Sequence, residues 1–526
     1  MASAVINPPV ATKSESAQFR QNMEQVTRHS LAFLLGTLFT TVAGYFFKLY
    51  LARALGAQAL GIYTLGMTIV GSLGVVAAFG LPQTIARFVA MYRAQRDDVR
   101  LAKLLQHSFL FLIVSNSLLG FLAWSARHWI AQRFYHTAAL EEYIVLFSLL
   151  MLLGSLNCFL GQALGACGDV AHRTVIVNFV GGPLMMLAAV ALISSGFGLG
   201  GYVFAQVASS LAVLILLGRT VFSFVPLPFY KRKVSPSVVP AQVISFSGFM
   251  FLIQGLEYVL SQADKIFLGL YMDPSDIGVY SVAVTMVAFV PIVLQSVNQI
   301  FSPLITNLHT RGEHALLRRI YQSLTKWIIG LTLPLITVVV AFAAPVMRLF
   351  GPEFEPGWLV LVIGVIGQTV NCAVGSVGYL LLMSGNQRRL LRIDAVMAAS
   401  TLLLDAWLIP RLGLIGAAIA GVAVTSATNL WSLWEVRRRL LLWPYNRGYS
   451  QLLLPTVCMT ALVLAMRVCL QGWISDALLF ALALPLAYVS FVGTALLLGL
   501  EEDDLLIAET VWARLGFSFR RKAATP

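Results

Sequence analysis

KLYLARALGAQALGIYTLGMTIV at residues 48–70 and KIFLGLYMDPSDIGVYSVAVTMV at residues 265–287 are two copies of one pattern, 217 residues apart. The identical positions include a lysine, a Gly-x-Tyr motif and a threonine: Lys48 and Lys265, Gly61 and Gly278, Tyr63 and Tyr280, Thr68 and Thr285. Aliphatic matches arise by chance, but a matched lysine and a matched Gly-x-Tyr at a near-constant offset indicate an internal repeat. The chain therefore consists largely of two related halves.

The apolar runs that contain these copies continue along almost the whole chain. Of its 526 residues, 58% are hydrophobic and 11% are charged, and the mean hydropathy is +0.82. Soluble domains carry about 25% charged residues, so a soluble protein is excluded. Each long apolar run predicts a spanning helix, because backbone groups in lipid must pair within their own segment. We expect about fourteen spans, at residues 30–52, 60–81, 107–125, 142–162, 174–195, 199–222, 244–271, 277–304, 326–347, 358–383, 393–410, 413–434, 451–470 and 474–499.

The distribution of lysine and arginine predicts the topology of these spans. With a cytoplasmic N-terminus, 28 of the 36 Lys and Arg residues fall in inside loops or tails and six fall outside. The other two, Lys48 and Lys265, lie within spans. This excess follows the positive-inside rule, and one missed helix would break it. We therefore expect a multi-pass protein of the bacterial inner membrane with both termini in the cytoplasm.

The repeat offset covers six predicted spans, so both halves start on the same side of the membrane. Such halves are related by a pseudo-two-fold axis along the membrane normal. The predicted fold class is an all-α polytopic membrane protein with two six-helix lobes and two additional C-terminal helices. The predicted segments are a cytoplasmic N-terminal tail (1–28), an N-lobe (29–225), a basic cytoplasmic linker (226–242), a C-lobe (243–434), the extra helices (435–499) and a cytoplasmic C-terminal tail (500–526).

Several motifs in and around the repeat resemble a known superfamily. They are Ala52-Arg53-Ala54-Leu55-Gly56, Gly61-Ile62-Tyr63, Gly80-Leu81, Arg87-Phe88-Val89-Ala90, Ala263-Asp264-Lys265, Gly278-Val279-Tyr280 and Gly413-Leu414-Ile415-Gly416-Ala417. Together they resemble the multidrug/oligosaccharidyl-lipid/polysaccharide exporter superfamily, and within it the O-antigen-type flippases of lipid-linked oligosaccharides. The resemblance covers roughly residues 30 to 440.

This resemblance implies V-shaped lobes, a cavity lined by helices one, two, seven and eight, and alternating access. It implies that the chain moves a polyprenyl-diphosphate-linked oligosaccharide from the cytoplasmic to the outer leaflet for cell-surface polysaccharide assembly. One departure concerns the lipid II flippases, which carry several arginines in helix one. Here helix one offers Lys48 as its charge, which argues against lipid II and leaves other polyprenyl-linked glycans open.

Helix seven carries the strongest candidates for transport. Glu257 lies near the middle of its span, Asp264 follows two turns later, and Gln254, Ser261 and Lys265 form a neighbouring polar stripe. A charge inside a span costs about 2.5–3.5 kcal/mol on insertion scales, so such residues are functional candidates. The stripe either faces a cavity, where it contacts substrate or titrates with a coupling ion, or forms an ion pair between helices. Glu257 has no cation within one turn, which favours proton coupling.

Lys48 and Lys265 are a pair by the repeat, and a diphosphate headgroup needs cations. The alternative is that both lysines snorkel to the interface. Arg53 and Arg87, at the ends of helices one and two, are either substrate ligands or interfacial anchors.

Neutral polar side chains on two other helices suit sugars, which form many neutral hydrogen bonds. They are Gln295, Asn298 and Gln299 on helix eight and Thr37 and Thr41 on helix one. Helix packing is the alternative role for such residues. In contrast, Asp394 and Asp405 of helix eleven are interpreted as structural.

Three competing functions remain open. A cation-coupled multidrug antiporter of the same superfamily has twelve helices, so residues 451–499 argue against it. A major-facilitator transporter would carry glycines in the loop 87–98 that are missing here. A membrane glycan polymerase would need a large outside loop, and the outside connections are too short.

The sequence also predicts what the chain works with. The basic residues lie in loops between spans, which argues against nucleic acid. No catalytic, metal-ligand or phosphate-loop spacing occurs, so we expect a transporter without a cofactor, driven by an H⁺ or Na⁺ gradient. The expected partners are the lipid-linked glycan, membrane lipids and polysaccharide polymerase machinery, with the chain itself a monomer.

Overall fold

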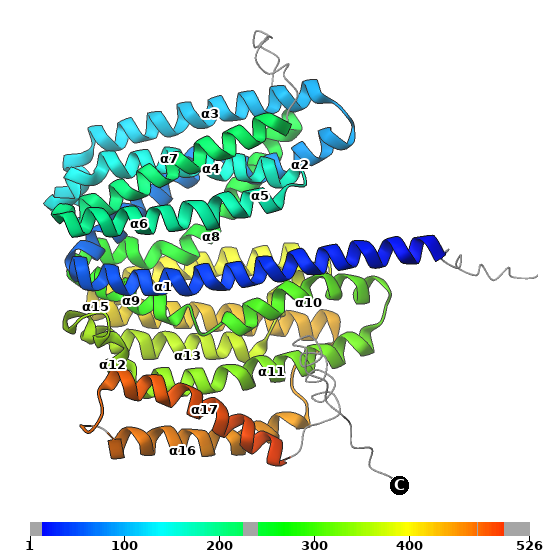
Figure 1. Ribbon diagram of the computed structural model, residues 1–526, viewed down its shortest axis with the longest axis vertical. Coiled ribbons are helices and arrows are strands. Elements are labelled where there is room, and N and C mark those ends of the chain that lie inside the picture. The colour runs from blue at the N-terminus through cyan, green and yellow to red at the C-terminus, as the bar shows by residue number, and fades with distance from the viewer. Residues whose placement is uncertain (1–12, 225–239, 471, 499–526) are drawn as a thin grey trace, which may run out of the picture. The chain divides into compact units, whose positions relative to one another are not determined.

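The computed structural model describes the backbone of residues 13–224, 240–470 and 472–498. Within these ranges it describes side chains from residue 43 onward, apart from Ile300 and Arg447. The described residues form helices and no β-strand element (Figure 1). The predicted all-α fold class is therefore confirmed.

Ten helices of the described chain are long and apolar enough to cross a membrane. An eleventh arises if α9 and α10, which bend by 51° at a short break, form one span. Three of the ten contain a break where the sequence predicts the boundary between two spans: Ala43–Ala78, Val170–Ser223 and Gln387–Leu440. A multi-pass membrane protein is thus confirmed, while the count of fourteen stays a prediction.

Glycine makes these breaks possible. Gly56 has φ 81° and ψ 171°, and Gly413 has φ 57° and ψ −132°. Residues with a Cβ rarely adopt either conformation. Each glycine therefore ends one helical segment and lets the next begin in another direction.

The chain divides into two compact units, and neither follows one half of the sequence. Unit 1 comprises the described residues of Met1–Tyr50, Leu81–Ser115 and Leu152–Ile244. Unit 2 comprises those of Leu51–Gly80, Asn116–Met151 and Ser245–Pro526. Residues 51–80 and 116–151 of the predicted N-lobe thus pack in the same unit as the C-terminal half.

The helices that lie wholly or partly in unit 1 come from the first 224 residues. They are α1 (Lys13–Ala78, to Tyr50), α2 (Leu81–Ala94), α3 (Asp98–Ser125, to Ser115), α4 (Ile144–Ala166, from Leu152), α5 (Val170–Thr174), η3 (Val175–Gly181), α6 (Gly182–Leu192), η4 (Ile193–Phe197) and α7 (Gly198–Phe224). Polar side chains join them across apolar surfaces. Ser209 of α7 donates to the Gly181 carbonyl at 2.8 Å, and Asn157 of α4 donates to the Ser210 carbonyl at 2.9 Å. These bonds fix α7 against both η3 and α4.

Unit 2 contains the remaining helices. They are the rest of α1, α3 and α4 with η1 (Trp129–Phe134) and η2 (Ala138–Tyr143), then α8 (Ala241–Tyr271), α9 (Pro274–Val287), α10 (Ile292–Thr310), α11 (His314–Ala341), α12 (Ala343–Arg348), η6 (Pro352–Gly357), α13 (Trp358–Val374), α14 (Val377–Met383), α15 (Gln387–Leu440), η7 (Arg447–Leu452), α16 (Leu453–Leu470) and α17 (Asp476–Leu498).

The last two helices, α16 and α17, dock on α11 (Figure 1). The Arg467 guanidinium of α16 donates to the Ala341 carbonyl, and the Tyr488 hydroxyl of α17 donates to the Leu331 carbonyl at 2.8 Å. In the buried part of this contact, the Lys326 ammonium donates to Gln451 Oε1 at 3.1 Å. The extra helices are therefore an integral part of unit 2.

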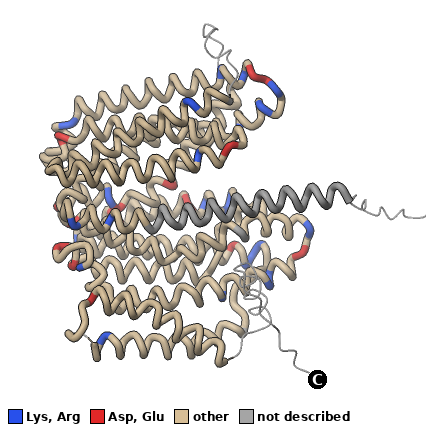
Figure 2. Tube along the Cα trace, viewed as in Figure 1, with Lys and Arg blue, Asp and Glu red and all other residues tan. Residues whose placement is uncertain are grey.

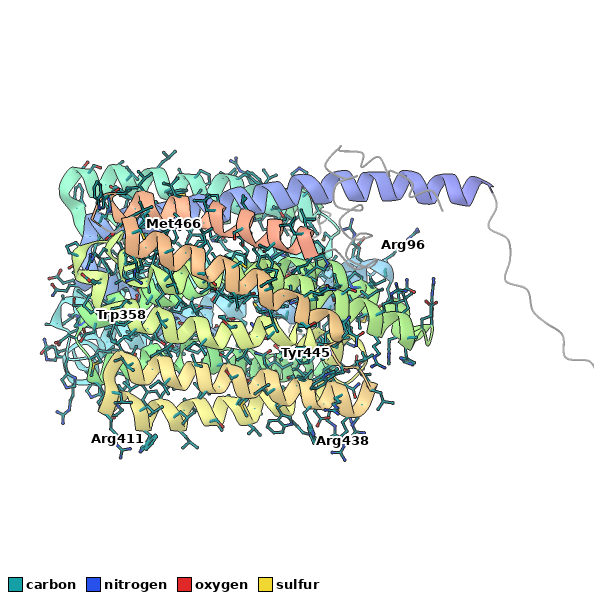
Figure 3. All side chains as sticks on the ribbon, turned by 90° about the horizontal axis from the view of Figure 1, so that it is seen from below. Arg96, Trp358, Arg411, Arg438, Tyr445 and Met466 are labelled. Atoms are coloured by element: carbon teal, nitrogen blue, oxygen red, sulfur yellow. The ribbon has the colours of Figure 1, made fainter. Side chains whose placement is uncertain are left out.

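Charged side chains gather near helix ends and leave the middle of each bundle apolar (Figure 2). In unit 2, Trp358 and Arg411 lie at one end, and Tyr445 and Arg438 lie at the other (Figure 3). Several arginines stack on tryptophans there, with the Arg411 guanidinium 4.8 Å from the Trp407 ring centroid. Trp and Arg at both ends are typical of the two membrane interfaces.

Candidate functional site

Helix α8 presents the predicted polar stripe. The Glu257 side chain is exposed, and Gln254, Asp264 and Lys265 are half-buried. The face next to this stripe packs on α1: the Tyr258 hydroxyl donates to the Thr68 carbonyl. The polar face of α8 is therefore held in register by its contact with residues 51–80.

Asp264 is fixed by two hydrogen bonds. Its Oδ2 accepts from the Tyr280 hydroxyl of α9 at 2.7 Å, and its Oδ1 accepts from the Lys265 backbone N–H at 2.8 Å. The Lys265 ammonium donates to Gln262 Oε1 at 2.6 Å. Lys265 therefore uses an amide, and not the neighbouring carboxylate, as its partner in the described chain.

Asp405 of α15 joins this group, which the sequence did not predict. Its side chain is 1% exposed, and neither carboxylate oxygen has a hydrogen-bond partner in the described chain. It lies close enough to Asp264 and Tyr280 to interact with both electrostatically. A buried carboxylate without such a partner is stable only when a proton or cation neutralises it. We name Asp264, Tyr280 and Asp405 the acidic cluster.

A second pair of acids connects the same two helices. Glu257 of α8 interacts electrostatically with Asp394 of α15. The sequence interpretation gave Asp394 and Asp405 a structural role, whereas the structure places each of them next to a candidate acid of α8. The available signal was the rarity of any acid within an apolar span.

The neutral polar candidates on α10 differ in burial. Gln295 and Gln299 are exposed, and Asn298 is buried with its Oδ1 lacking a hydrogen-bond partner in the described chain. Their role as sugar ligands stays a prediction. Thr37 and Thr41 lie in α1, but their side chains are outside the described residues.

The remaining basic candidates lie apart in the chain. Arg53 is exposed in unit 2, and its Nε donates to the Leu349 carbonyl at 2.7 Å. Arg87 is exposed in unit 1, 5.8 Å from the Phe88 ring centroid, and Lys48 is half-buried in the same unit. The bond of Arg53 favours an anchoring role for that residue.

The repeated glycines form a symmetric crossing between α1 and α9. A Cβ placed on Gly61 would lie 1.6 Å from the Pro274 carbonyl oxygen, and one on Gly278 would lie 1.9 Å from the Ala57 carbonyl oxygen. Ala57 and Pro274 are themselves 217 residues apart. The crossing is therefore a local two-fold contact between equivalent positions, and it explains why Gly-x-Tyr recurs.

Glu353 of η6 strengthens the α1 side of this crossing. Its Oε1 accepts a hydrogen bond from the Ala57 backbone N–H at 3.0 Å, directly after the break at Gly56. An acceptor for a free N–H at a helix start is typically worth about 1 kcal/mol. Glu353→Ala should therefore lower the free energy of unfolding by about 1 kcal/mol. Thermal unfolding in detergent checks this, with the exposed Glu142→Ala as the control. Equal melting of the two variants would contradict the capping role.

Comparison with known proteins places the chain in a family. The family model described as "Polysaccharide biosynthesis protein" matches residues 50–356. The chain belongs to this family. Within described relatives, the "Probable low-salt glycan biosynthesis flippase Agl15" of Haloferax volcanii is 21% identical over 412 residues. The alignment covers 77% of this chain and 82% of Agl15.

Solved structures show which fold the polysaccharide biosynthesis family member adopts. "Lipid II flippase MurJ, inward closed conformation" is similar with a TM-score of 0.71 and 14% identity, over 93% of this chain and 100% of that chain. A multidrug resistance MATE family transporter in an inward-facing conformation follows with a TM-score of 0.61 and 14% identity, over 76% and 94%. The predicted exporter superfamily is therefore confirmed.

Proposed function

We propose that this family member is a flippase that moves a polyprenyl-diphosphate-linked oligosaccharide to the outer leaflet by alternating access. The observation that carries the proposal is the family match over residues 50–356 on a transporter fold. The glycan flippase name of the Haloferax relative supports the same substrate class. We further propose that the chain lies in a bacterial inner membrane with both termini in the cytoplasm.

The substrate chemistry fits the residues of α8 and α10. A diphosphate needs cationic donors, and Lys265 is a half-buried ammonium held by an amide instead of a carboxylate. Sugars need neutral donors and acceptors, and Gln295 and Gln299 are exposed amides. The chain would act as a transporter without catalytic chemistry, as a monomer that delivers its product to polysaccharide polymerase machinery.

The acidic cluster supports coupling to an ion gradient. Asp405 is buried and unpartnered in the described chain, so its charge must change or be neutralised. We propose that H⁺ or Na⁺ exchange at this cluster drives transport, because the sequence offers no phosphate-binding loop for ATP.

A cation-coupled multidrug antiporter is the second candidate function. The fold similarity to a MATE family transporter favours it, and acids on α8 would suit cationic drugs. The docking of α16 and α17 on α11 favours the flippase, because the antiporters have twelve helices.

A reconstituted assay separates the two functions. Proteoliposomes that contain the full chain receive either a fluorescent polyprenyl-diphosphate glycan or a cationic drug, with and without an ion gradient. The flippase proposal expects the glycan lipid to move to the other leaflet. Movement of the drug without the glycan lipid would overturn it.

The two repeat-related lysines provide a variant for this assay. Lys48→Ala combined with Lys265→Ala should weaken binding of the diphosphate lipid at least about tenfold, because two charge-assisted contacts are lost. Arg133→Ala, an exposed arginine outside the candidate site, is the matched control. Unchanged binding by the double variant would remove both lysines from the site.

A further inference from the structure

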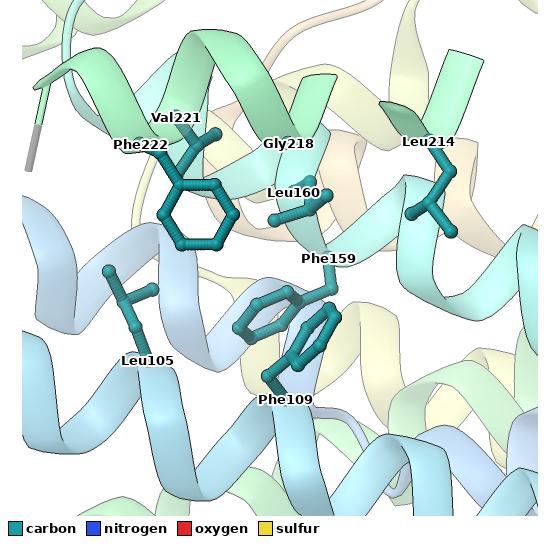
Figure 4. A pocket seen from close by; sticks show the side chains of 8 residues that line it. All are labelled: Leu105, Phe109, Phe159, Leu160, Leu214, Gly218, Val221 and Phe222. Carbon is teal, nitrogen blue, oxygen red and sulfur yellow. The ribbon is translucent and has the colours of Figure 1, made fainter. Parts of the chain in front are cut away.

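Unit 1 contains an apolar cavity with a volume of about 140 Å³ (Figure 4). Its lining comes from α3, α4 and α7: Leu105, Phe109, Phe159, Leu160, Leu214, Gly218, Val221 and Phe222. The Phe109 and Phe159 ring centroids lie 6.0 Å apart and form one wall. No residue of this lining carries a polar side chain that could hold water. An apolar cavity of this size stays dry, and apolar groups fill it when they are available.

The exposed side of the cavity faces the surface where the protein meets its surroundings. Phe222 lines the cavity and is 56% exposed. It continues an exposed apolar stripe of α7 with Leu211 and Ile215. On α3, Leu110 and Val114 form a similar exposed stripe. Because these stripes are apolar and belong to spanning helices, the surroundings are lipid chains.

Two cations lie on the same stripes, near the ends of the helices that flank the cavity. Arg219 is exposed between Ile215 and Phe222 along α7, five residues before α7 ends at Phe224. Lys103 is half-buried in the second turn of α3, in line with Leu110. Long basic side chains at such positions reach the headgroup layer and attract phosphate.

We propose that this cavity binds an acyl chain of an anionic phospholipid of the bilayer, with Arg219 and Lys103 contacting its phosphate. The apolar walls match a hydrocarbon chain, and the two cations match a lipid that carries net negative charge. This site is distinct from the acidic cluster, all of whose residues belong to unit 2. The proposal does not depend on which substrate the protein transports.

The volume argues for an acyl chain and against the isoprenoid tail of a transported lipid. At about 30 Å³ for a group the size of a water, 140 Å³ holds roughly five such groups in a row. A straight chain end of a few methylenes fills this space. An isoprenoid tail carries a methyl branch on every unit and is far longer, so most of it would stay outside.

Gly218 provides a matched pair of variants. A Cβ on Gly218 would lie 3.9 Å from the Phe222 ring, which is an ordinary contact, so Gly218→Ala leaves the cavity open. Gly218→Phe places a ring inside it. The full chain is reconstituted in nanodiscs with phosphatidylglycerol that carries a photoreactive diazirine near the end of one acyl chain, and crosslinked peptides are mapped by mass spectrometry.

We expect crosslinks to peptides of α4 and α7 that contain Phe159 and Leu214 in the wild type and in Gly218→Ala. They should fall at least about fivefold in Gly218→Phe. Arg219→Gln with Lys103→Gln should reduce the preference for phosphatidylglycerol over phosphatidylcholine by a similar factor. Equal labelling of the wild type and Gly218→Phe, absence of labelling at these peptides, or displacement of the probe by a polyprenyl phosphate would each overturn the proposal.

Discussion

Gly61→Ala and Gly278→Ala should each destabilise the protein severely and abolish transport. At both positions a Cβ would fall less than 2 Å from a backbone carbonyl oxygen, at Pro274 and Ala57 respectively. A backbone atom cannot rotate away as a flexible side chain does, so α1 and α9 would have to separate. Overpacking of this kind costs about 3 kcal/mol or more, a large fraction of total stability.

The symmetry of the crossing adds a sharper expectation. Both glycines serve one contact, so the first substitution already separates the helices and the second should add little. Thermal unfolding and glycan-lipid movement in proteoliposomes test this for both single variants and the double variant. Gly255→Ala in α8 is the control, because a Cβ there meets nothing within 4 Å. Wild-type stability of either single variant would show that the helices do not cross this closely.

The repeat and its crossing show how far sequence reasoning reaches here. Periodic apolar runs and the arginine distribution predict spanning helices, because both follow from the bilayer itself. The offset of 217 predicts equivalent halves, but it cannot predict that Gly61 meets Pro274 while Gly278 meets Ala57. That contact depends on how two helices cross, which residue spacing within one helix does not encode.

The acidic residues show the same limit. Glu257 and Asp264 stand out in the sequence because each is a charge within an apolar run, and the same is true of Asp394 and Asp405. Which acids meet depends on the packing of α8 against α15, more than 120 residues later in the chain. Sequence reasoning could therefore find the members of the acidic cluster but could not assemble it.

Asp405→Asn should leave the protein folded and remove its dependence on an ion gradient. The amide has nearly the same shape as the carboxylic acid, and it carries no charge that must be neutralised in a site with 1% exposure. Asp264→Asn should act in the same direction, because its Oδ2 is the acceptor for the Tyr280 hydroxyl at 2.7 Å. Since the proposed cluster exchanges its cation only if a carboxylate can gain and lose charge, gradient-driven transport should fall at least about tenfold.

The decisive measurement compares transport with and without a gradient, for H⁺ and for Na⁺ separately. In the wild type one gradient should accelerate glycan-lipid movement, whereas Asp405→Asn should show the same slow rate under both conditions. Tyr280→Phe keeps both carboxylates and removes one donor, so it should shift the ion concentration needed for half-maximal rate without abolishing coupling. Asp98→Asn, an exposed acid at the start of α3, should behave as wild type. If Asp405→Asn stays folded and still responds fully to the gradient, its buried carboxylate serves packing between α8 and α15, and the coupling ion must act elsewhere, with Glu257 and Asp394 as the next pair to test.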